Sequence, residues 1–260
     1  MTIKDLIASL QNREEAAFAS VSNIFASSTT SIEEKMEIAE VLGKVGDHRL
    51  VSPNAEDYWV HVDLGYTKLL VAKFPVTTQE WRTFLEGDYN DDSLWSIDGL
   101  KWKSKERPSW IQLASSPAVA NFVIENQPAV GISWFEAEAF AKAYGARLPD
   151  CQERIDIVRG QERRVYPWGK SFGHGNCNTE EVGLGRPCVV GLFPSDKTPE
   201  GVYDLAGNVA EWTNESFEGK ARLHPGSWSR GMMSSWSKAF ESISPAARLN
   251  DLGFRLVKDL

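Results

Sequence analysis

Helical patterning in this sequence stops at Gly160, and the hundred residues that follow carry almost none. Large planar side chains are abundant instead, with ten Trp, twelve Phe and six Tyr. Each such ring covers much surface at little entropic cost, so these residues suit a core built from irregular loops. Helix starts precede Gly160, each with a capping side chain and an acid three residues later: Thr2, Ser31, Thr77, Ser133 and Asp150.

The first 50 residues differ from the rest. Apolar residues recur at helical spacing from Leu6 to Phe25 and again from Met36 to Leu42, before Gly43 and Gly46 end the pattern. We expect a helical hairpin over residues 1–50 and a larger domain over residues 51–260, joined by a linker at residues 45–49. Two interpretations stay open: an extension packed on the main domain, or an adaptor toward another protein.

Within the larger domain the pattern predicts short elements. The apolar run at residues 69–72 predicts a strand, and helices are expected from Thr77 through Leu85, from Ser133 to about Tyr144 and from Asp150 to near Gly160. Residues 87–116 are polar and show no helical period. No internal repeat is present.

Charge and cysteine usage restrict the partners. A net charge of −8 argues against nucleic acid as the main partner, because phosphate binding requires a basic field. No stretch approaches the roughly 18 apolar residues that span a bilayer, and the N-terminus lacks an apolar signal core. Three cysteines, Cys151, Cys177 and Cys188, have no metal-type spacing, which favours a reduced, cytoplasmic setting.

A series of motifs from residue 60 onward is more specific than any one of them. In chain order they are Phe74-Pro-Val-Thr-Thr-Gln-Glu-Trp81, Gln127-Pro-Ala-Val-Gly-Ile-Ser-Trp134, Ala146-Arg-Leu-Pro149, Tyr166-Pro-Trp-Gly169, Gly201-Val-Tyr-Asp-Leu-Ala-Gly-Asn-Val-Ala-Glu-Trp212, Gly226-Ser-Trp228 and Leu252-Gly-Phe-Arg255. This order resembles the formylglycine-generating enzyme (sulfatase-modifying factor) family over residues 60–260. The resemblance implies an α+β fold of the C-type-lectin-like kind, poor in regular structure and often holding calcium.

The resemblance does not carry over the family's oxidase activity. In the oxidase, two cysteines after the Gly-Ser-aromatic motif bind copper and oxidise a substrate cysteine to formylglycine. Aligned from Gly226, those positions fall on Arg230 and Ser235, which lack the soft thiolate that copper(I) prefers. No cysteine follows Cys188. We therefore expect no copper and no formylglycine-generating activity, and leave open whether the chain is an enzyme at all.

Iron-dependent sulfoxide synthases of the same superfamily rely on histidines in an additional helical domain. This chain has four histidines, no His-x-x-x-His pair and no histidine before His48. We do not expect that chemistry here.

The segment from Asp204 to Glu211 resembles the family's calcium loop. Calcium takes six to eight oxygens from carboxylates and carbonyls, and small residues let a loop turn its carbonyls inward. By resemblance the ligands are the side chains of Asp204 and Glu211 and the carbonyls of Gly207 and Val209. The alternative is that Asn208 and Glu211 hydrogen-bond the loop without metal. The family's second calcium site begins near Asn176, but no acid stands at residues 183–186.

The C-terminal segment is predicted to be a ligand-binding surface for a protein or another macromolecule. Trp and Arg suit anchoring roles, Met adapts its shape, and Ser supplies adjustable hydrogen bonds. The chain also resembles the variable proteins of diversity-generating retroelements, which end in a Gly-Ser-Trp … Gly-Phe-Arg segment with a mutable ligand-binding stretch between. The predicted binding residues are Arg230, Met232, Met233, Ser235, Trp236, Lys238, Phe240 and Asn250.

Two rival hypotheses remain. One is a metal-dependent oxidoreductase or modifying enzyme that uses the same cleft, with Glu241, Asp251, His224 and Arg248 as its candidate polar residues. The other is a scaffold or sensor whose N-terminal hairpin docks another subunit.

Overall fold

The two ends of the main domain meet in one sheet. The last strand, β7 (Val257–Asp259), pairs antiparallel with β2 (Lys68–Ala72), which also pairs with β1 (Trp59–Asp63). The strand expected at residues 69–72 is therefore present and central in this sheet. The computed structural model describes residues 2–27, 29–105 and 117–260.

The second sheet carries the C-terminal segment. Its strand order is β5-β4-β3-β6, and β3 and β6 are parallel while the other pairs are antiparallel. After β4 the chain forms β5 at one edge of the sheet and then crosses to form β6 at the opposite edge. The strands are β3 (Ala210–Phe217), β4 (Lys220–His224), β5 (Glu241–Ile243) and β6 (Leu252–Phe254).

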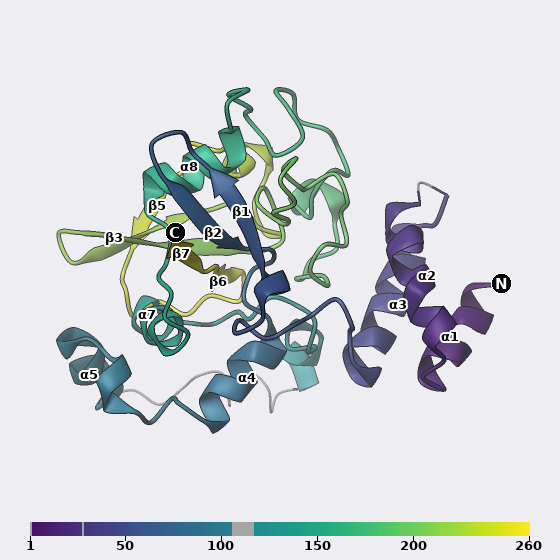
Figure 1. Cartoon of the computed structure of the whole chain (residues 1–260), viewed down its shortest axis with the longest axis horizontal. Helices are drawn as coiled ribbons and strands as arrows, with labels where there is room; N and C mark the ends of the chain where they lie inside the picture. The colour runs from purple at the N-terminus through teal and green to yellow at the C-terminus, as the bar shows by residue number, and fades with distance from the viewer. Residues whose placement is uncertain (1, 28, 106–116) are drawn as a thin grey trace.

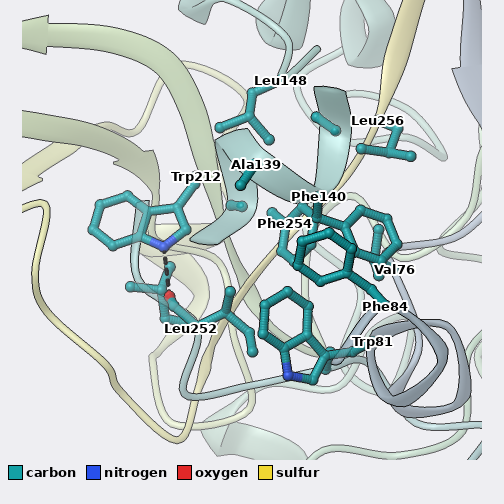
Figure 2. Close-up of a cluster of buried hydrophobic side chains, with 14 of the residues drawn as sticks. Val76, Trp81, Phe84, Ala139, Phe140, Leu148, Trp212, Leu252, Phe254 and Leu256 are labelled. Atoms are coloured by element: carbon teal, nitrogen blue, oxygen red, sulfur yellow. Dashed lines mark hydrogen bonds between the residues drawn. The ribbon is translucent and has the colours of Figure 1, made fainter. Parts of the chain in front are cut away.

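An aromatic core lies between the helices and this second sheet (Figure 2). Helix α4 (Thr78–Glu86) contributes Trp81 and Phe84, and helix α7 (Trp134–Ala143) contributes Phe140. All three rings are fully buried. The close contacts between rings, such as 5.2 Å between the centroids of Phe84 and Phe140, are typical of edge-on and tilted aromatic pairs.

Capping side chains begin the helices where the sequence predicts. Thr77, Ser133 and Asp150 each accept a hydrogen bond from the backbone N–H three residues on, and the acid at that position bonds back. These caps start α4, α7 and α8 (Cys151–Arg159). Short 3-10 turns lie at Glu56–Tyr58, Asp92–Leu94, Pro117–Phe122, Glu180–Val182 and Met232–Ser235.

One helix arises where no helical period is visible. Helix α5 (Ile97–Lys103) lies inside the polar stretch 87–116, whose residues 106–116 fall outside the described part. Ser96 caps the helix, and Trp95 and Trp102 stack with ring centroids 6.1 Å apart. Tertiary packing of these aromatics, rather than a repeating apolar face, holds the helix in place.

The N-terminal region forms three helices where a hairpin of two is predicted. They are α1 (Ile3–Gln11), α2 (Glu15–Ala26) and α3 (Ile32–Val45), at the side of the molecule (Figure 1). Arg13, with a φ of 59°, breaks the first predicted helix, because a left-handed residue cannot continue a right-handed helix. Buried residues of all three helices share one hydrophobic cluster with Cys188, Val189, Leu192 and Phe193. The extension is thus packed on the main domain.

Within the described ranges, no helix is both long enough and apolar enough to cross a bilayer.

Candidate binding surface

Residues 229–251, named here the binding segment, join β4 to β6 and are fixed at several points by backbone contacts. The Ser237 N–H donates to the Val165 carbonyl at 3.1 Å, and the Glu180 N–H donates to the Arg230 carbonyl at 3.0 Å. The Glu181 carboxylate accepts the Met232 N–H at 2.7 Å. Glu181, which lies near the position of the family's second calcium site, thus holds this segment.

The binding segment exposes an unusual share of large apolar side chains. Eight such side chains are exposed in the described part of the protein, and four of them belong to this segment. They are Met232, Met233, Trp236 and Leu249, with exposed fractions of 43%, 69%, 41% and 40%. Several large apolar side chains exposed on one segment favour a contact surface, whereas single exposed apolar residues are common.

The other predicted binding residues differ in their surroundings. Lys238 and Asn250 are exposed, and Phe240 is half-buried beneath Arg222, whose guanidinium carbon lies 5.3 Å from the ring centroid. Ser235 is only 1% exposed, so its side chain does not fit a contact role. Arg230 is half-exposed but pairs with Glu241 at 3.4 Å, and its Nε lies 4.0 Å from Asp251.

Asp251 closes the base of the binding segment, a role that the sequence does not reveal. It is almost fully buried, and its Oδ2 accepts hydrogen bonds from the hydroxyls of Ser227, at 3.1 Å, and Ser229. The carboxylate therefore ties the first residues of the segment to its last one. The signal that could have found it is the acid directly before the Leu252-Gly-Phe-Arg255 motif.

His224 is structural. Its Nε2 donates to the Trp236 carbonyl at 3.1 Å and its Nδ1 accepts from the Gly226 N–H at 3.3 Å, so the ring is neutral with its proton on Nε2. Burial, with a smaller effect from Arg154, lowers the pKa of His224 to about 3. A ring held neutral and occupied at both nitrogens is unsuited to proton transfer.

The polar residues proposed for an enzyme do not converge in one cleft. Glu241 and Asp251 are both engaged with Arg230. Arg248 instead pairs with the buried Glu136 at 3.0 Å, beneath Trp102. Among the described residues, no three His, Cys, Asp or Glu side chains are grouped so that they could hold a metal ion.

The three cysteines are reduced and buried. Burial raises the pKa of the Cys151 thiol to about 11 and raises the pKa values of Cys177 and Cys188 further above their ordinary range. All three therefore hold their protons at neutral pH, and a thiol without its thiolate form is a poor nucleophile and metal ligand.

The loop from Asp204 to Glu211 is held by arginine side chains. Arg154 Nε donates to Glu211 Oε2 at 2.8 Å, and Arg255 Nη2 donates to Oε1 at 2.8 Å. All three side chains are buried, with no more than 1% exposed. Although burial raises the pKa of Glu211, Arg255 and Arg154 bring it below its ordinary value.

These contacts do not fit a calcium ion at the predicted ligands. Both Glu211 oxygens accept from guanidinium groups, and Asp204 Oδ2 accepts the Gly191 N–H at 2.8 Å. The Gly207 carbonyl accepts the Val209 N–H at 3.0 Å. Two positive charges beside Glu211 repel a divalent cation. Calcium at Asp204, Gly207, Val209 and Glu211 stays a prediction from the resemblance, and the arrangement favours the metal-free alternative.

Asp196 is a further residue of this loop that the sequence does not mark. Its two oxygens accept the backbone N–H groups of Leu205, Ala206 and Gly207 at 3.0–3.2 Å. These groups point inward and have no strand partner, so the carboxylate satisfies donors that burial would leave unpaired. No local pattern around Asp196 predicts this contact.

Removal of calcium is expected to leave the protein's stability unchanged. Arginine side chains already neutralise Glu211, so we expect the loop to keep its structure without an ion. The check is the melting temperature in EDTA and in excess calcium chloride. A fall of several degrees in EDTA, restored by calcium but not by magnesium, would show that the loop binds the ion despite its arginines.

The fold and the surface define a C-type-lectin-like α+β domain whose second sheet carries the binding segment between β4 and β6. The model of the sulfatase-modifying factor enzyme 1-like domain matches residues 39–260, and the chain belongs to this family. The match begins inside α3, so the family domain includes part of the N-terminal helical region.

Similar proteins with curated names include both an oxygenase and an inactive enzyme. Hercynine oxygenase of Mycobacterium tuberculosis is 30% identical over 161 residues, which cover 55% of this chain and 36% of the relative. Inactive C-alpha-formylglycine-generating enzyme 2 of Bos taurus is 30% identical over 179 residues, covering 56% of this chain and 59% of the relative. The chain thus spans between a third and three fifths of the length of these relatives.

Solved structures show the same fold. PvdO from Pseudomonas aeruginosa aligns with a TM-score of 0.55 at 20% identity, covering 74% of this chain and 81% of its own. Treponema denticola variable protein 1 aligns with a TM-score of 0.53 at 19% identity, covering 74% of this chain and 85% of its own.

Proposed function

We propose that this chain is a non-catalytic binding protein whose binding segment recognises a protein partner. The observation that carries the proposal is the gathering of Met232, Met233, Trp236 and Leu249 as exposed apolar side chains on one anchored segment. Trp and Met are favourable contact residues, because a large ring supplies area and a thioether adapts its shape. Lys238 and Asn250 add a polar rim.

The backbone contacts support binding with a prearranged surface. Contacts to Val165, Glu180 and Glu181 anchor the segment along its length, and the bond from Ser227 to Asp251 anchors its end, so a partner has less chain to order. Preorganisation of this kind lowers the entropic cost of association. The likeness to a protein named inactive in Bos taurus supports a role without catalysis.

The segment contains both exposed and buried residues. This division supports a surface whose exposed side chains vary between related genes while its buried anchoring residues are kept. Met232, Met233, Trp236, Lys238 and Asn250 face solvent, while Ser235, Ser237 and Asp251 are buried. Changes at the first group leave the anchors in place. Sequencing of the genomic neighbourhood tests this subclass: a reverse-transcriptase gene with a template repeat matching the end of this gene supports it, and invariant sequences across isolates contradict it.

The test of the binding surface is affinity capture from the native host with three forms of the intact chain. They are the wild type, the double variant Met233→Ala/Trp236→Ala, and Phe217→Ala, which removes an exposed ring outside the binding segment, at the end of β3. We expect one protein retained by the wild type and the Phe217 variant and reduced about tenfold or more with the double variant. Equal recovery by all three forms sinks the assignment.

The second candidate is a metal-dependent enzyme, favoured by the likeness to an oxygenase. Elemental analysis of protein purified from its native host separates the two. Iron or copper at one equivalent, lost on substitution of Glu241, supports the enzyme. Metal below a tenth of an equivalent, alongside partner capture, supports the binding protein. Cytoplasmic location stays a prediction that fractionation of host cells tests.

A further inference from the structure

A hollow of about 620 Å³ lies between the outer side of α8, the turn that follows it and Lys238 of the binding segment. Three cations line it, Arg159, Arg163 and Lys238, against one carboxylate, Asp156. That carboxylate is already engaged, because its Oδ2 accepts from the Tyr66 hydroxyl at 3.2 Å and from Gln152 Nε2 at 2.8 Å. The hollow is therefore positively charged in a chain whose net charge is −8.

The two arginines are unusual within this protein. Among the described arginines, all except Arg13, Arg159 and Arg163 have a carboxylate within 4.0 Å. Two of these three line the same hollow. A guanidinium group matches a carboxylate with two parallel hydrogen bonds, so arginines left without such a partner are available for one from outside.

The backbone that carries these arginines is held in a tight turn. Gly160 and Arg163 both have left-handed backbone, with φ of 51° and 54°. The Arg163 N–H donates to the Gly160 carbonyl at 3.2 Å, and the neighbouring Arg164 is buried with its Nε on the Val158 carbonyl at 3.0 Å. Left-handed backbone at a non-glycine residue is strained and persists only where the surroundings enforce it. The end of α8 carries Arg159, and the turn that follows carries Arg163 on the same hollow.

We propose that this hollow binds acidic side chains of the protein partner that contacts the binding segment. The inference rests on the proposed function and adds the charge of the partner. The partner surface is expected to carry carboxylates beside the apolar region that contacts the binding segment. Lys238 belongs to both regions, so one partner surface reaches both. Complementary charge of this kind raises the association rate and selects among partners.

The test measures binding of a fluorescently labelled hexaglutamate peptide to the full chain by anisotropy, without any partner. We expect the wild type to bind the peptide and the double variant Arg159→Gln/Arg163→Gln to bind it about tenfold or more weakly. Arg13→Gln is the matched control, since it removes another unpaired arginine from the N-terminal helices and should leave binding unchanged.

Two outcomes overturn the proposal. Either the wild type fails to bind the peptide, or Arg13→Gln weakens binding as much as the double variant does. These outcomes are independent of the capture experiment. Loss of a captured partner with Met233→Ala/Trp236→Ala, but full retention with Arg159→Gln/Arg163→Gln, keeps the binding function and rejects the acidic partner.

Discussion

Glu211→Gln should lower the free energy of unfolding by roughly 3–5 kcal/mol, because it leaves two buried guanidinium groups without their carboxylate. Arg154 and Arg255 are at most 1% exposed, and both reach Glu211 at 2.8 Å. Glutamine keeps the volume but carries no charge. The free energy from urea unfolding, followed by tryptophan fluorescence, measures the loss.

Glu215→Gln is the matched control for this charge. It lies on the same strand, β3, and pairs with an arginine, Arg222, at 2.9 Å, but both side chains are more than a third exposed. An exposed pair contributes about 0–1 kcal/mol. Equal losses in the two variants would contradict the role given to burial, and a loss below 1 kcal/mol for Glu211→Gln would contradict the arginine-held loop.

Trp212→Ala should lower the free energy of unfolding by roughly 3–5 kcal/mol, because it leaves a cavity in the core. Trp212 is fully buried in the core between the second sheet and α7, and its Nε1 donates to the Ile132 carbonyl at 2.8 Å (Figure 2). The substitution removes both the ring and the Nε1–H that donates to the Ile132 carbonyl. The free energy from urea unfolding measures the change, provided that its dependence on urea concentration is the same in both proteins.

Trp236→Ala provides the comparison, because the same truncation is made where the ring is 41% exposed. Surface substitutions typically change stability by about 0.5 kcal/mol. A loss with Trp236→Ala as large as with Trp212→Ala would show that Trp236 is a core residue, and it would remove the main anchor of the binding surface.

Local chemistry could be predicted where a short stretch of chain decides it. The capping boxes at Thr77, Ser133 and Asp150 start helices at the expected residues, since a cap involves only the next three residues. Helix α5 was not predictable in this way, because Trp95 and Trp102 hold it through packing. The break between α1 and α2 at Arg13 was not predictable either, because the helical spacing of apolar residues continues across it.

The candidate site was predictable in part. Exposure of Met232, Met233 and Trp236 agrees with a segment that has no strand or helix period. Ser235 is buried although the sequence predicts a contact role, because a serine in a loop carries no signal of burial. The hollow beside α8 was not visible in the sequence at all, since it forms only when Lys238 meets Arg159 and Arg163, about 75–79 residues earlier in the chain.

By itself, the sequence determined the family, the helix starts and the lack of cysteines where the oxidase needs them, because each depends on residue identity or on neighbours a few positions away. Only the tertiary structure decided how the loop at Glu211 is neutralised. Its two arginines lie 57 residues before it and 44 residues after it, and folding alone brings them to one carboxylate. Tertiary structure also anchors residues 226–251. The pairing of β6 with β3 brings Asp251 next to Ser227, 24 residues earlier in the chain.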